Sequence, residues 1–511
     1  MIRVFVYLSI GFFLFSNTAW SNNIPQIDQC HAEFKNGILE VFYDLSDDEE
    51  IRISVDCKIF DPFDHSLIGI DQIEGDIGPM VLTGANKSIR IRFIEPASLP
   101  STIRIHLSAH DGAPLNIEEI LNEISESSLQ THLLSIQGKR HAVNDPVFME
   151  KARNAIKDYT SRRLPSRFLT GSLPNYQVVN IEGNQWGGES PDRIQVIDAH
   201  YDTYGISPGA DDNGSGVAGV MEAMKVLSPY YSKKTIRYLF FDLEEAGLIG
   251  SLFYLNNQKS ANDQIENCIN FEMIGYYSDQ ENTQDLPAGF NILFPSQYNQ
   301  IIANKRKGDF ITNTGNTLSK NLVQVFSNAG KNFVPELKII SLEVPGTGTV
   351  APDLRRSDHA MFWDKNIPAL MITDGANFRN KNYHTPKDSA QLLNYNFMSQ
   401  VVRTSVASLI ELAGIEHAAA KTLDLRMETS VKEQEIKLPR YQYIQGVLYI
   451  SSDETTCNCQ VRLFDSEGHL LRDDRLKPNE QIQWPLQGPT RIHFLQIQSG
   501  HRSHTLKFLN H

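Results

Sequence analysis

The feature that most constrains the fold is an alternation of apolar, strand-like runs with a helical pattern in the middle of the chain. The apolar runs occupy residues 194–199, 236–241 and 269–274. After the first run, apolar residues recur at helical spacing and would share one face: Val217, Val220, Met221, Met224 and Leu227. Strand, helix and strand in this order predict an α/β domain with a mostly parallel central sheet flanked by helices. Sites in such sheets gather at the carboxyl ends of the strands.

The sequences on either side of this region are rich in β signals. Alternating runs at 51–55 and 89–93, separated by turn-like clusters, predict a small sandwich. Strand candidates return after residue 420. We therefore expect three domains after residue 21: a β-rich N-terminal domain (22–115), an α/β domain (116–415) and a β-rich C-terminal domain (420–511).

The overall charge narrows the classes of function. The chain has 511 residues, with 47 Lys and Arg against 61 Asp and Glu, for a net charge of −14. Because the balance is acidic and there is no basic run, we expect no binding to nucleic acid. Apolar residues make up 41% and charged residues 21%, which is ordinary globular usage and excludes a wholly disordered chain.

Residues 1–21 have the pattern of a cleavable signal peptide. Arg3 precedes an almost uninterrupted apolar run at 4–15, and Ala19-Trp20-Ser21 has the small-x-small pattern of a cleavage site. The alternative is an uncleaved anchor, but a membrane-spanning helix needs about 20 apolar residues. The sequence therefore predicts an exported protein, periplasmic or secreted, with no stable membrane association after cleavage.

Export makes the cysteines informative, because disulfides persist in oxidising compartments. Cys30 and Cys57 are candidates for a disulfide within the N-terminal β domain. Cys457 and Cys459 would point to the same face of a strand, at a Cα separation near the upper limit for a bridge. Cys268 lies in an apolar stretch and is expected to be a buried thiol.

Polar clusters follow the apolar runs of the α/β domain. They are Asp198-Ala199-His200-Tyr201-Asp202-Thr203, Pro208-Gly209-Ala210-Asp211-Asp212-Asn213-Gly214-Ser215-Gly216, Phe241-Asp242-Leu243-Glu244-Glu245-Ala246-Gly247, Asn270-Phe271-Glu272-Met273-Ile274-Gly275 and, further on, Tyr383-His384-Thr385-Pro386. Taken singly, such clusters are ordinary helix caps or solvated helix starts. Histidines and carboxylates that repeatedly follow strands predict a divalent metal site.

In combination these motifs resemble those of the M28 zinc aminopeptidases, a di-zinc family that includes bacterial leucyl aminopeptidases. The matching motifs are His200-x-Asp202-Thr203, Gly209-Ala210-Asp211-Asp212-Asn213-x-Ser215-Gly216, Glu244-Glu245-x-Gly247-x-x-Gly250-Ser251 and His384-Thr385-Pro386-x-Asp388. The resemblance covers residues 125–415 and leaves out the flanking β domains. It implies the zinc-exopeptidase fold, which agrees with the α/β prediction above.

The resemblance implies two Zn²⁺ per chain and five metal ligands: His200, Asp212, Glu245, Glu272 and His384. His200 and Glu272 would bind one zinc, Glu245 and His384 the other, and Asp212 both. Glu272 stands where most members have aspartate, so this ligand is one methylene longer. The resemblance also implies a cis peptide bond between Asp212 and Asn213.

The same resemblance implies an aminopeptidase that hydrolyses the N-termini of peptides or proteins through a metal-bridging water. Glu244 would be the general base and Asp202 would orient His200. Phe378 and Tyr383, close to His384 in sequence, are candidates for the substrate pocket, or else for core packing. Three alternatives remain open: a glutaminyl-cyclase-like enzyme, a carboxypeptidase using Arg355, Arg356 or Arg379, and a non-catalytic binding relative.

Overall fold

The computed structural model describes residues 23–48 and 52–427, and then 440–444, 447–451, 459–465, 470–477, 480–486, 492–499 and 502–509. The expected signal peptide lies outside the described residues, as do Cys457 and the side chain of Cys459. The chain divides into two compact units with the boundary after Met427. Among the helices in the described part of the chain, none is long and apolar enough to cross a membrane.

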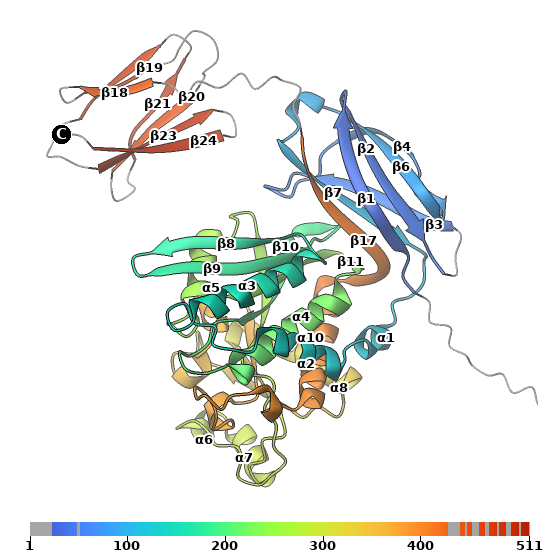
Figure 1. Ribbon diagram of the computed structural model, residues 1–511, viewed down its shortest axis with the longest axis vertical. Helices are drawn as coiled ribbons and strands as arrows, with labels where there is room; N and C mark the ends of the chain where they lie inside the picture. Colours follow the sequence, from blue (N-terminus) through green and yellow to red (C-terminus); the bar gives the residue numbers. More distant parts are fainter. Residues whose placement is uncertain are drawn as a thin grey trace, which may run out of the picture. The chain divides into compact units, whose positions relative to one another are not determined.

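The centre of the first unit is an eight-stranded mixed sheet (Figure 1). Its strands, in spatial order, are β15 (Ile339–Val344), β14 (Ile311–Asn316), β16 (Ala369–Thr373), β13 (Gln264–Phe271), β10 (Ser190–His200), β12 (Lys234–Phe241), β9 (Tyr176–Gln185) and β8 (Ser166–Leu173). The four central strands are parallel to one another, while β9 and β14 join them antiparallel. The expected parallel core is therefore confirmed, and the edges of the sheet run in mixed directions.

The two faces of this sheet have separate apolar cores. Ile197 and Ala199 of β10 face one core, whereas Ile194 and Val196 face the other. Successive strand residues point to opposite faces, so a strand that is apolar throughout is covered on both sides. This burial explains why the runs in β10, β12 and β13 are continuous rather than alternating.

Helices cover both faces. The first core contains residues of α1 (Ile117–Asn122), α2 (Glu126–Ile136), α3 (Pro146–Ser161), α4 (Gly216–Leu227), α8 (Lys320–Phe333) and α10 (Tyr395–Ala413). The second contains residues of α6 (Phe290–Leu293), α7 (Pro295–Ala303) and α9 (His359–Asp364). The short helix α5 (Ile249–Phe253) contacts β9. The result is a three-layer α/β domain.

The N-terminal segment forms the predicted sandwich. One sheet consists of β1 (Gln26–Lys35), β2 (Ile38–Ser46), β6 (Gly84–Phe93) and β4 (Ile70–Gly75). The other consists of β11 (Tyr230–Ser232), β17 (Ile415–Arg426), β7 (Thr102–His110), β3 (Arg52–Phe60) and β5 (Gly78–Leu82). Their inner faces share one apolar core.

The predicted domain boundaries are wrong at two places, because β11 and β17 belong to the sandwich. β17 begins directly after α10 and pairs antiparallel with β7 along its length, from Ala418 with His110 to Arg426 with Thr102. The predicted boundary at 415–420 thus falls inside one strand. The place of β17 in the sandwich depends on pairing between residues that are more than 300 positions apart in sequence, and no local pattern indicates such a pairing.

The candidate disulfide between Cys30 and Cys57 is not formed, since both are free thiols. Cys30 lies in β1 and Cys57 in β3, on opposite sheets of the sandwich. Cys57 is buried in the apolar core that the two sheets share, and Cys30 packs against that core without forming a disulfide. Cys268 is buried and free, as expected, and its Sγ donates to Asp198.

The second unit is all β in its described residues, as predicted. One sheet contains β18 (Arg440–Ile444), β19 (Val447–Ser451) and β22 (Gln481–Pro485). The other contains β21 (Leu470–Leu476), β20 (Cys459–Phe464), β23 (Ile492–Ser499) and β24 (Arg502–Leu509). Leu448, Val461 and Trp484 are among the residues of its small apolar core.

Candidate active site

Three adjacent strands of the central sheet bring the first site residues together. β10 lies between β12 and β13, and all three are parallel. His200 is the last residue of β10 and is in register with Phe241, the last residue of β12. Glu244 and Glu245 follow β12 by a few residues, and Glu272 follows β13 directly. Because these carboxyl ends meet at one edge, the side chains converge, as the sequence predicts.

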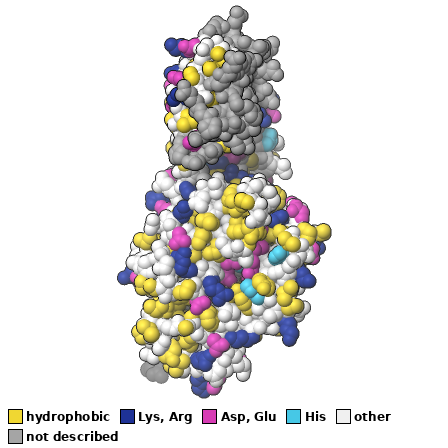
Figure 2. All heavy atoms as spheres, turned by 90° about the vertical axis from the view of Figure 1, so that its left-hand side faces the viewer, with side chains coloured by type: hydrophobic (Ala, Val, Ile, Leu, Met, Phe, Trp, Pro, Cys, Tyr) yellow, Lys and Arg dark blue, Asp and Glu magenta, His cyan; other side chains and the backbone are white. Residues whose placement is uncertain are grey.

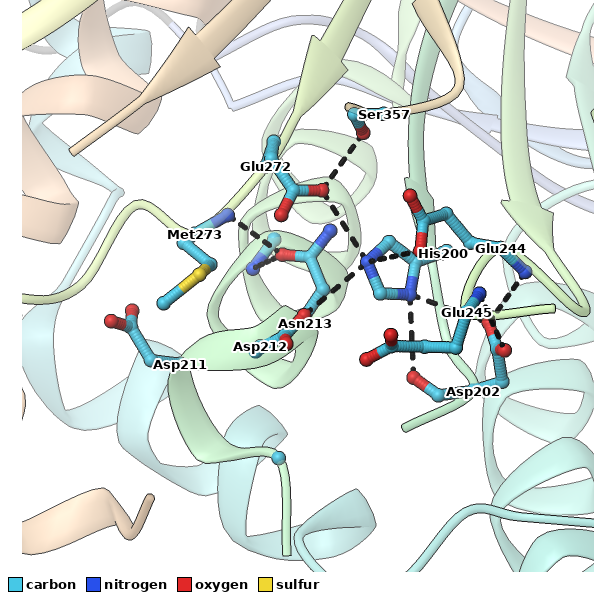
Figure 3. A network of polar contacts seen from close by, with 12 residues as sticks. His200, Asp202, Asp211, Asp212, Asn213, Glu244, Glu245, Glu272, Met273 and Ser357 are labelled. Atoms are coloured by element: carbon cyan, nitrogen blue, oxygen red, sulfur yellow. Dashed lines mark hydrogen bonds and ion pairs between the residues drawn. The ribbon is translucent and has the colours of Figure 1, made fainter. Parts of the chain in front are cut away.

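The loop between β10 and α4 supplies Asp212. Gly209 has φ 58°, and a Cβ atom there would lie 2.2 Å from the Thr203 side chain, so this turn requires glycine. The Asp212–Asn213 peptide bond is cis, as the family resemblance implies. The Asn213 side chain accepts a hydrogen bond from the Met273 amide at 3.1 Å and donates to the Phe271 carbonyl at 2.7 Å. The loop is therefore tied to the end of β13 (Figure 3).

Carboxylates surround the Nε2 atom of His200. Asp212 Oδ1 lies 3.5 Å from this nitrogen and Glu272 Oε2 3.4 Å from it. Glu244 Oε2 lies at 3.9 Å. His200 is 1% exposed, so its ring is fully enclosed. One group of ligand atoms, from His200, Glu244 and Glu272, is compact enough to hold a metal ion.

A second group forms around His384. Its Nε2 atom lies 3.1 Å from Asp212 Oδ2 and 3.0 Å from Glu245 Oε2. Asp212, Glu245 and His384 are likewise compact enough to hold a metal ion. Asp212 directs one oxygen at each histidine, so a single carboxylate links the two groups.

Asp202 connects His200 to the glutamate pair. Its Oδ1 atom lies 3.3 Å from His200 Nδ1, the ring nitrogen that faces away from the cluster. The same carboxylate accepts hydrogen bonds from the backbone amides of Glu244, at 3.0 Å, and Glu245, at 3.1 Å. One buried side chain thus positions both the imidazole and the turn that carries the two glutamates (Figure 3).

The cluster contains buried polar atoms that lie within ion-pair distance of one another but form no hydrogen bond of normal geometry. In the part of the chain that the structure describes, no hydrogen bond reaches His200 Nε2, Asp212 Oδ2, Glu245 Oε1 or His384 Nε2. Unpaired buried polar atoms are costly and rare. Here they are imidazole nitrogens and carboxylate oxygens aimed at one place, which is the donor set that zinc takes. The residues present therefore fit divalent metal ions.

The pKa values show how strongly this cluster attracts positive charge. Burial lowers the pKa of His384, but Asp212 and Glu245 outweigh it and raise the value to about 9. Burial opposes protonation of His200 too, yet Glu244, Asp202 and Glu272 raise its pKa well above the ordinary value. The pKa of Glu244 is raised well above its usual range by burial, and further by the charges of Glu272 and Asp358.

Sequence reasoning missed several residues that hold the ligands. Ser357 donates to Glu272 Oε2 at 2.8 Å. Asp388 accepts from the backbone amides of Asp211 and Asp212, at 3.0 and 3.1 Å. Asp388 lies in the His-Thr-Pro-x-Asp motif, so a signal for it was present. Nothing local marks Ser357, which lies 85 residues from Glu272 in sequence.

His384 is stacked between two tyrosines. The Tyr383 ring lies 3.7 Å from the imidazole, centroid to centroid, and the Tyr204 ring 4.2 Å, with interplanar angles of 16° and 7°. Tyr204 comes from the loop after β10 and Tyr383 directly precedes His384. Tyr204 is a further contact that the sequence patterns did not single out.

A narrow cavity of about 70 Å³ opens beside Glu272. Phe378 and Tyr383, the two candidates for the substrate pocket, both line it. Most of its other lining side chains are apolar, including Leu286, Phe290, Phe310, Ile340, Leu342, Leu354 and Met371. Figure 2 shows acidic side chains and histidine near the centre of one face, with hydrophobic side chains around them.

The fold and the cluster define a three-layer α/β protein with a paired metal-ligand site. The model of peptidase family M28 matches residues 180–409. The uncharacterized protein YfbL of Escherichia coli (strain K12) is 33% identical over 234 residues, which cover 44% of this chain and 68% of that protein. The chain belongs to peptidase family M28.

More distant relatives have assigned activities. Leucine aminopeptidase 2 of Trichophyton rubrum is 26% identical over 240 residues, covering 47% of this chain and 42% of that protein, so the match spans less than half of that relative. Among solved structures, the LapA aminopeptidase of Legionella pneumophila is 22% identical with a TM-score of 0.44, covering 58% of this chain and 74% of that one.

Proposed function

We propose that this chain is an exported zinc-dependent aminopeptidase that holds two Zn²⁺ and removes N-terminal residues from peptides. The observation that carries the proposal is the Asp212 carboxylate, which directs one oxygen at His200 and the other at His384. Two histidines, each with further carboxylates, around one shared aspartate form a site for a pair of ions rather than for one. His200 and Glu272 would hold one ion, Glu245 and His384 would hold the other, and Asp212 would contribute to both.

Different residues of the protein then have separate roles in hydrolysis. Bound zinc supplies a Lewis acid for the scissile carbonyl and a water of lowered pKa. Glu244 accepts a proton from the attacking water and passes it to the leaving amine as the C–N bond breaks. Asp202 keeps His200 in one orientation and holds the turn on which Glu244 lies. The free α-amine of the substrate binds beside Glu245 and Glu272.

The narrow cavity beside Glu272 receives the side chain of the first residue. Phe378 and Tyr383 line it together with aliphatic and aromatic side chains. An apolar lining favours an apolar side chain by about 25 cal/mol for each Å² removed from water. Peptides that begin with leucine, methionine or phenylalanine are therefore the expected substrates.

A carboxypeptidase is the second candidate, because one of the three arginines considered lies at the site. Arg356 lines the narrow cavity and donates to Tyr383 Oη at 3.0 Å. Arg379 is buried and bonded to Gln284 and to the Phe310 carbonyl, and Arg355 pairs with Asp364. Of these three arginines, Arg356 would be the one to bind a substrate carboxylate.

One set of peptides separates these functions. A peptide with a free N-terminus and an amidated C-terminus should be cleaved at its first bond, whereas its N-acetylated form should not. Equal cleavage of both forms would indicate an endopeptidase, and cleavage only with a free C-terminus would indicate a carboxypeptidase. Elemental analysis of the purified protein should find two zinc ions per chain. Export is tested by N-terminal sequencing of the mature protein, which should begin near Asn22.

A further inference from the structure

A second, much larger cavity lies on the other side of the ligand cluster. It is a groove of about 860 Å³. Five segments line it: residues 141–144, Met149 and Arg153 of α3, residues 175–177 at the turn between β8 and β9, and residues 202–206 and 243–246, each with interruptions. We refer to it as the wide groove. Its volume lies within the range of about 300–1,000 Å³ that is typical of ligand sites.

The wide groove and the narrow cavity begin at opposite sides of the cluster. Asp202 and Glu245 line the wide groove, while Glu272 lines the narrow cavity. The two tyrosines that stack on His384 are divided in the same way. Tyr204 lines the wide groove, and Tyr383 lines the narrow cavity. A peptide whose scissile bond lies at the cluster can therefore extend in both directions.

The two cavities differ in what they can accept. The narrow cavity, of about 70 Å³, suits one side chain, whereas the wide groove, of about 860 Å³ by the same measure, is much larger. The substrate of an aminopeptidase has one residue before the scissile bond and a chain of any length after it. The size difference therefore assigns the wide groove to the chain that follows the bond.

The wide groove has a mixed lining in which several apolar side chains are exposed. Val143 is 81% exposed, Ile206 51%, Tyr204 45% and Tyr176 40%. Exposed apolar side chains gathered in one concave place mark a binding surface. Arg153, the one guanidinium among the described residues that line the groove, is paired with Asp242 at 2.8 Å and bonded to Tyr201. It is thus already engaged rather than available to a chain-terminal carboxylate.

We infer that the wide groove binds the residues that follow the scissile bond, so that the preferred substrates are peptides with two or more apolar residues after the cleaved position rather than dipeptides. This inference rests on the proposed aminopeptidase function. Tyr204 joins the groove to the cluster through its contact with His384, and Ile206, Val143 and Tyr176 also line the groove.

The test compares two amidated peptides that share the best first residue from a panel, written here as leucine: Leu-Gly-NH₂ and Leu-Phe-Val-Ala-NH₂. Initial release of leucine by the zinc-loaded full chain gives kcat/KM for each. We expect kcat/KM to be higher for the longer peptide by about tenfold or more, because its apolar side chains are removed from water when they bind in the groove. The Ile206→Asp variant should reduce this preference by about fivefold.

Leu134→Asp is the matched control. Leu134 is 55% exposed, close to the 51% of Ile206, and it lies on α2, away from both cavities. This variant carries the same change of charge and should keep the wild-type preference. Melting temperatures check that both variants fold.

Two outcomes would overturn the inference. One is a kcat/KM ratio near one between the two peptides for the wild-type enzyme, with Leu-Gly-NH₂ still cleaved. The other is an equal ratio in the Ile206→Asp and Leu134→Asp variants. In either case the aminopeptidase function would stand without the groove. If the wild-type enzyme cleaved no peptide of the panel at its N-terminus, the proposed function itself would fail, and the inference with it.

Discussion

His200 and His384 reach the candidate metal site from very different parts of the fold. His200 ends a central strand, is 1% exposed and faces Asp202 with its second ring nitrogen. His384 lies in a loop far along the chain, with φ 58° and a side chain 25% exposed, and it is held between two tyrosine rings. We call His200, Glu244 and Glu272 the strand-borne group, and Asp212, Glu245 and His384 the loop-borne group.

The contrast shows two ways of making a site rigid. Backbone hydrogen bonds of the sheet place His200 and Glu272 of the strand-borne group, so these two residues have few alternatives once β10 and β13 pair. The loop-borne group depends on side-chain contacts between segments far apart in sequence, such as Asp388 with the Asp212 amide. We therefore expect the loop-borne group to release metal more readily. The predictions below test this difference, beginning with the largest effect.

The largest effect should come from Glu244→Gln. Glu244 belongs to the strand-borne group by distance, yet we propose that it moves a proton and does not hold a metal. The variant should retain both zinc ions and lose about 10²–10⁴-fold in kcat. Kinetics together with elemental analysis measure this. Loss of one zinc would instead make Glu244 a ligand, and near-wild-type turnover in the metallated variant would refute its role as the base.

Glu272 tests the strand-borne group itself. Glu272→Ala should lose about one zinc per chain, because that ion would keep only His200 and the shared Asp212. Glu272→Asp preserves the charge and should keep two ions with weaker affinity and measurable activity. Elemental analysis after dialysis against a weak chelator distinguishes the two variants. An alanine variant with both zinc ions would remove Glu272 from the site and leave it only its hydrogen bond with Ser357.

Tyr204→Leu tests the loop-borne group with a smaller change. Removing one of the two rings stacked on His384 should weaken retention of one zinc by about two- to tenfold, since such ring pairs contribute about 0.5–1.5 kcal/mol. Zinc release is followed with a chromogenic chelator. Tyr176→Leu is the control, because Tyr176 is similarly exposed, at 40% against 45%, and lines the same groove without a ring contact to His384. Equal zinc release from both variants would mean that stacking does not hold His384.

The smallest effect on the metal site should come from Glu222→Gln, because Glu222 lies in α4 and belongs to neither group of ligands. Glu222 of α4 is buried and accepts hydrogen bonds from Ser125, Ser128, His132 and Lys225. Burial would raise its pKa, but the bonds from His132, Lys225 and Ser128 lower it from 4.5 to about 2. Breaking such a buried pair costs about 3–5 kcal/mol.

The sign of the pH effect follows from the lowered pKa. The charged Glu222 stabilises the fold fully above about pH 4.5, and this contribution is lost as the pH falls toward about 2. The difference in melting temperature between wild type and Glu222→Gln should therefore be largest above pH 4.5 and shrink below it. Zinc content at pH 7 should stay at two. A difference that grew on acidification would contradict the assigned hydrogen bonds.

The sequence alone predicted the α/β core and a converging cluster, for a physical reason. Apolar runs such as 194–199 encode doubly covered strands, and the carboxyl ends of parallel neighbours meet at one edge, so residues that follow the runs come together. His200, Asp202, Asp212, Glu244, Glu245, Glu272 and His384 do lie together in the structure. Their individual roles as ligands and base stay predictions.

Only the tertiary structure decided which distant segments meet. The pairing of β11 and β17 with strands of the sandwich and the contact of Ser357 with Glu272 both join segments that lie far apart in sequence. So does the placement of Tyr204 and Tyr383 on the two faces of His384, which separates the narrow cavity from the wide groove. Periodicity and turn chemistry are local properties of a sequence, whereas these contacts arise from how complete layers pack, and no short stretch of residues encodes that.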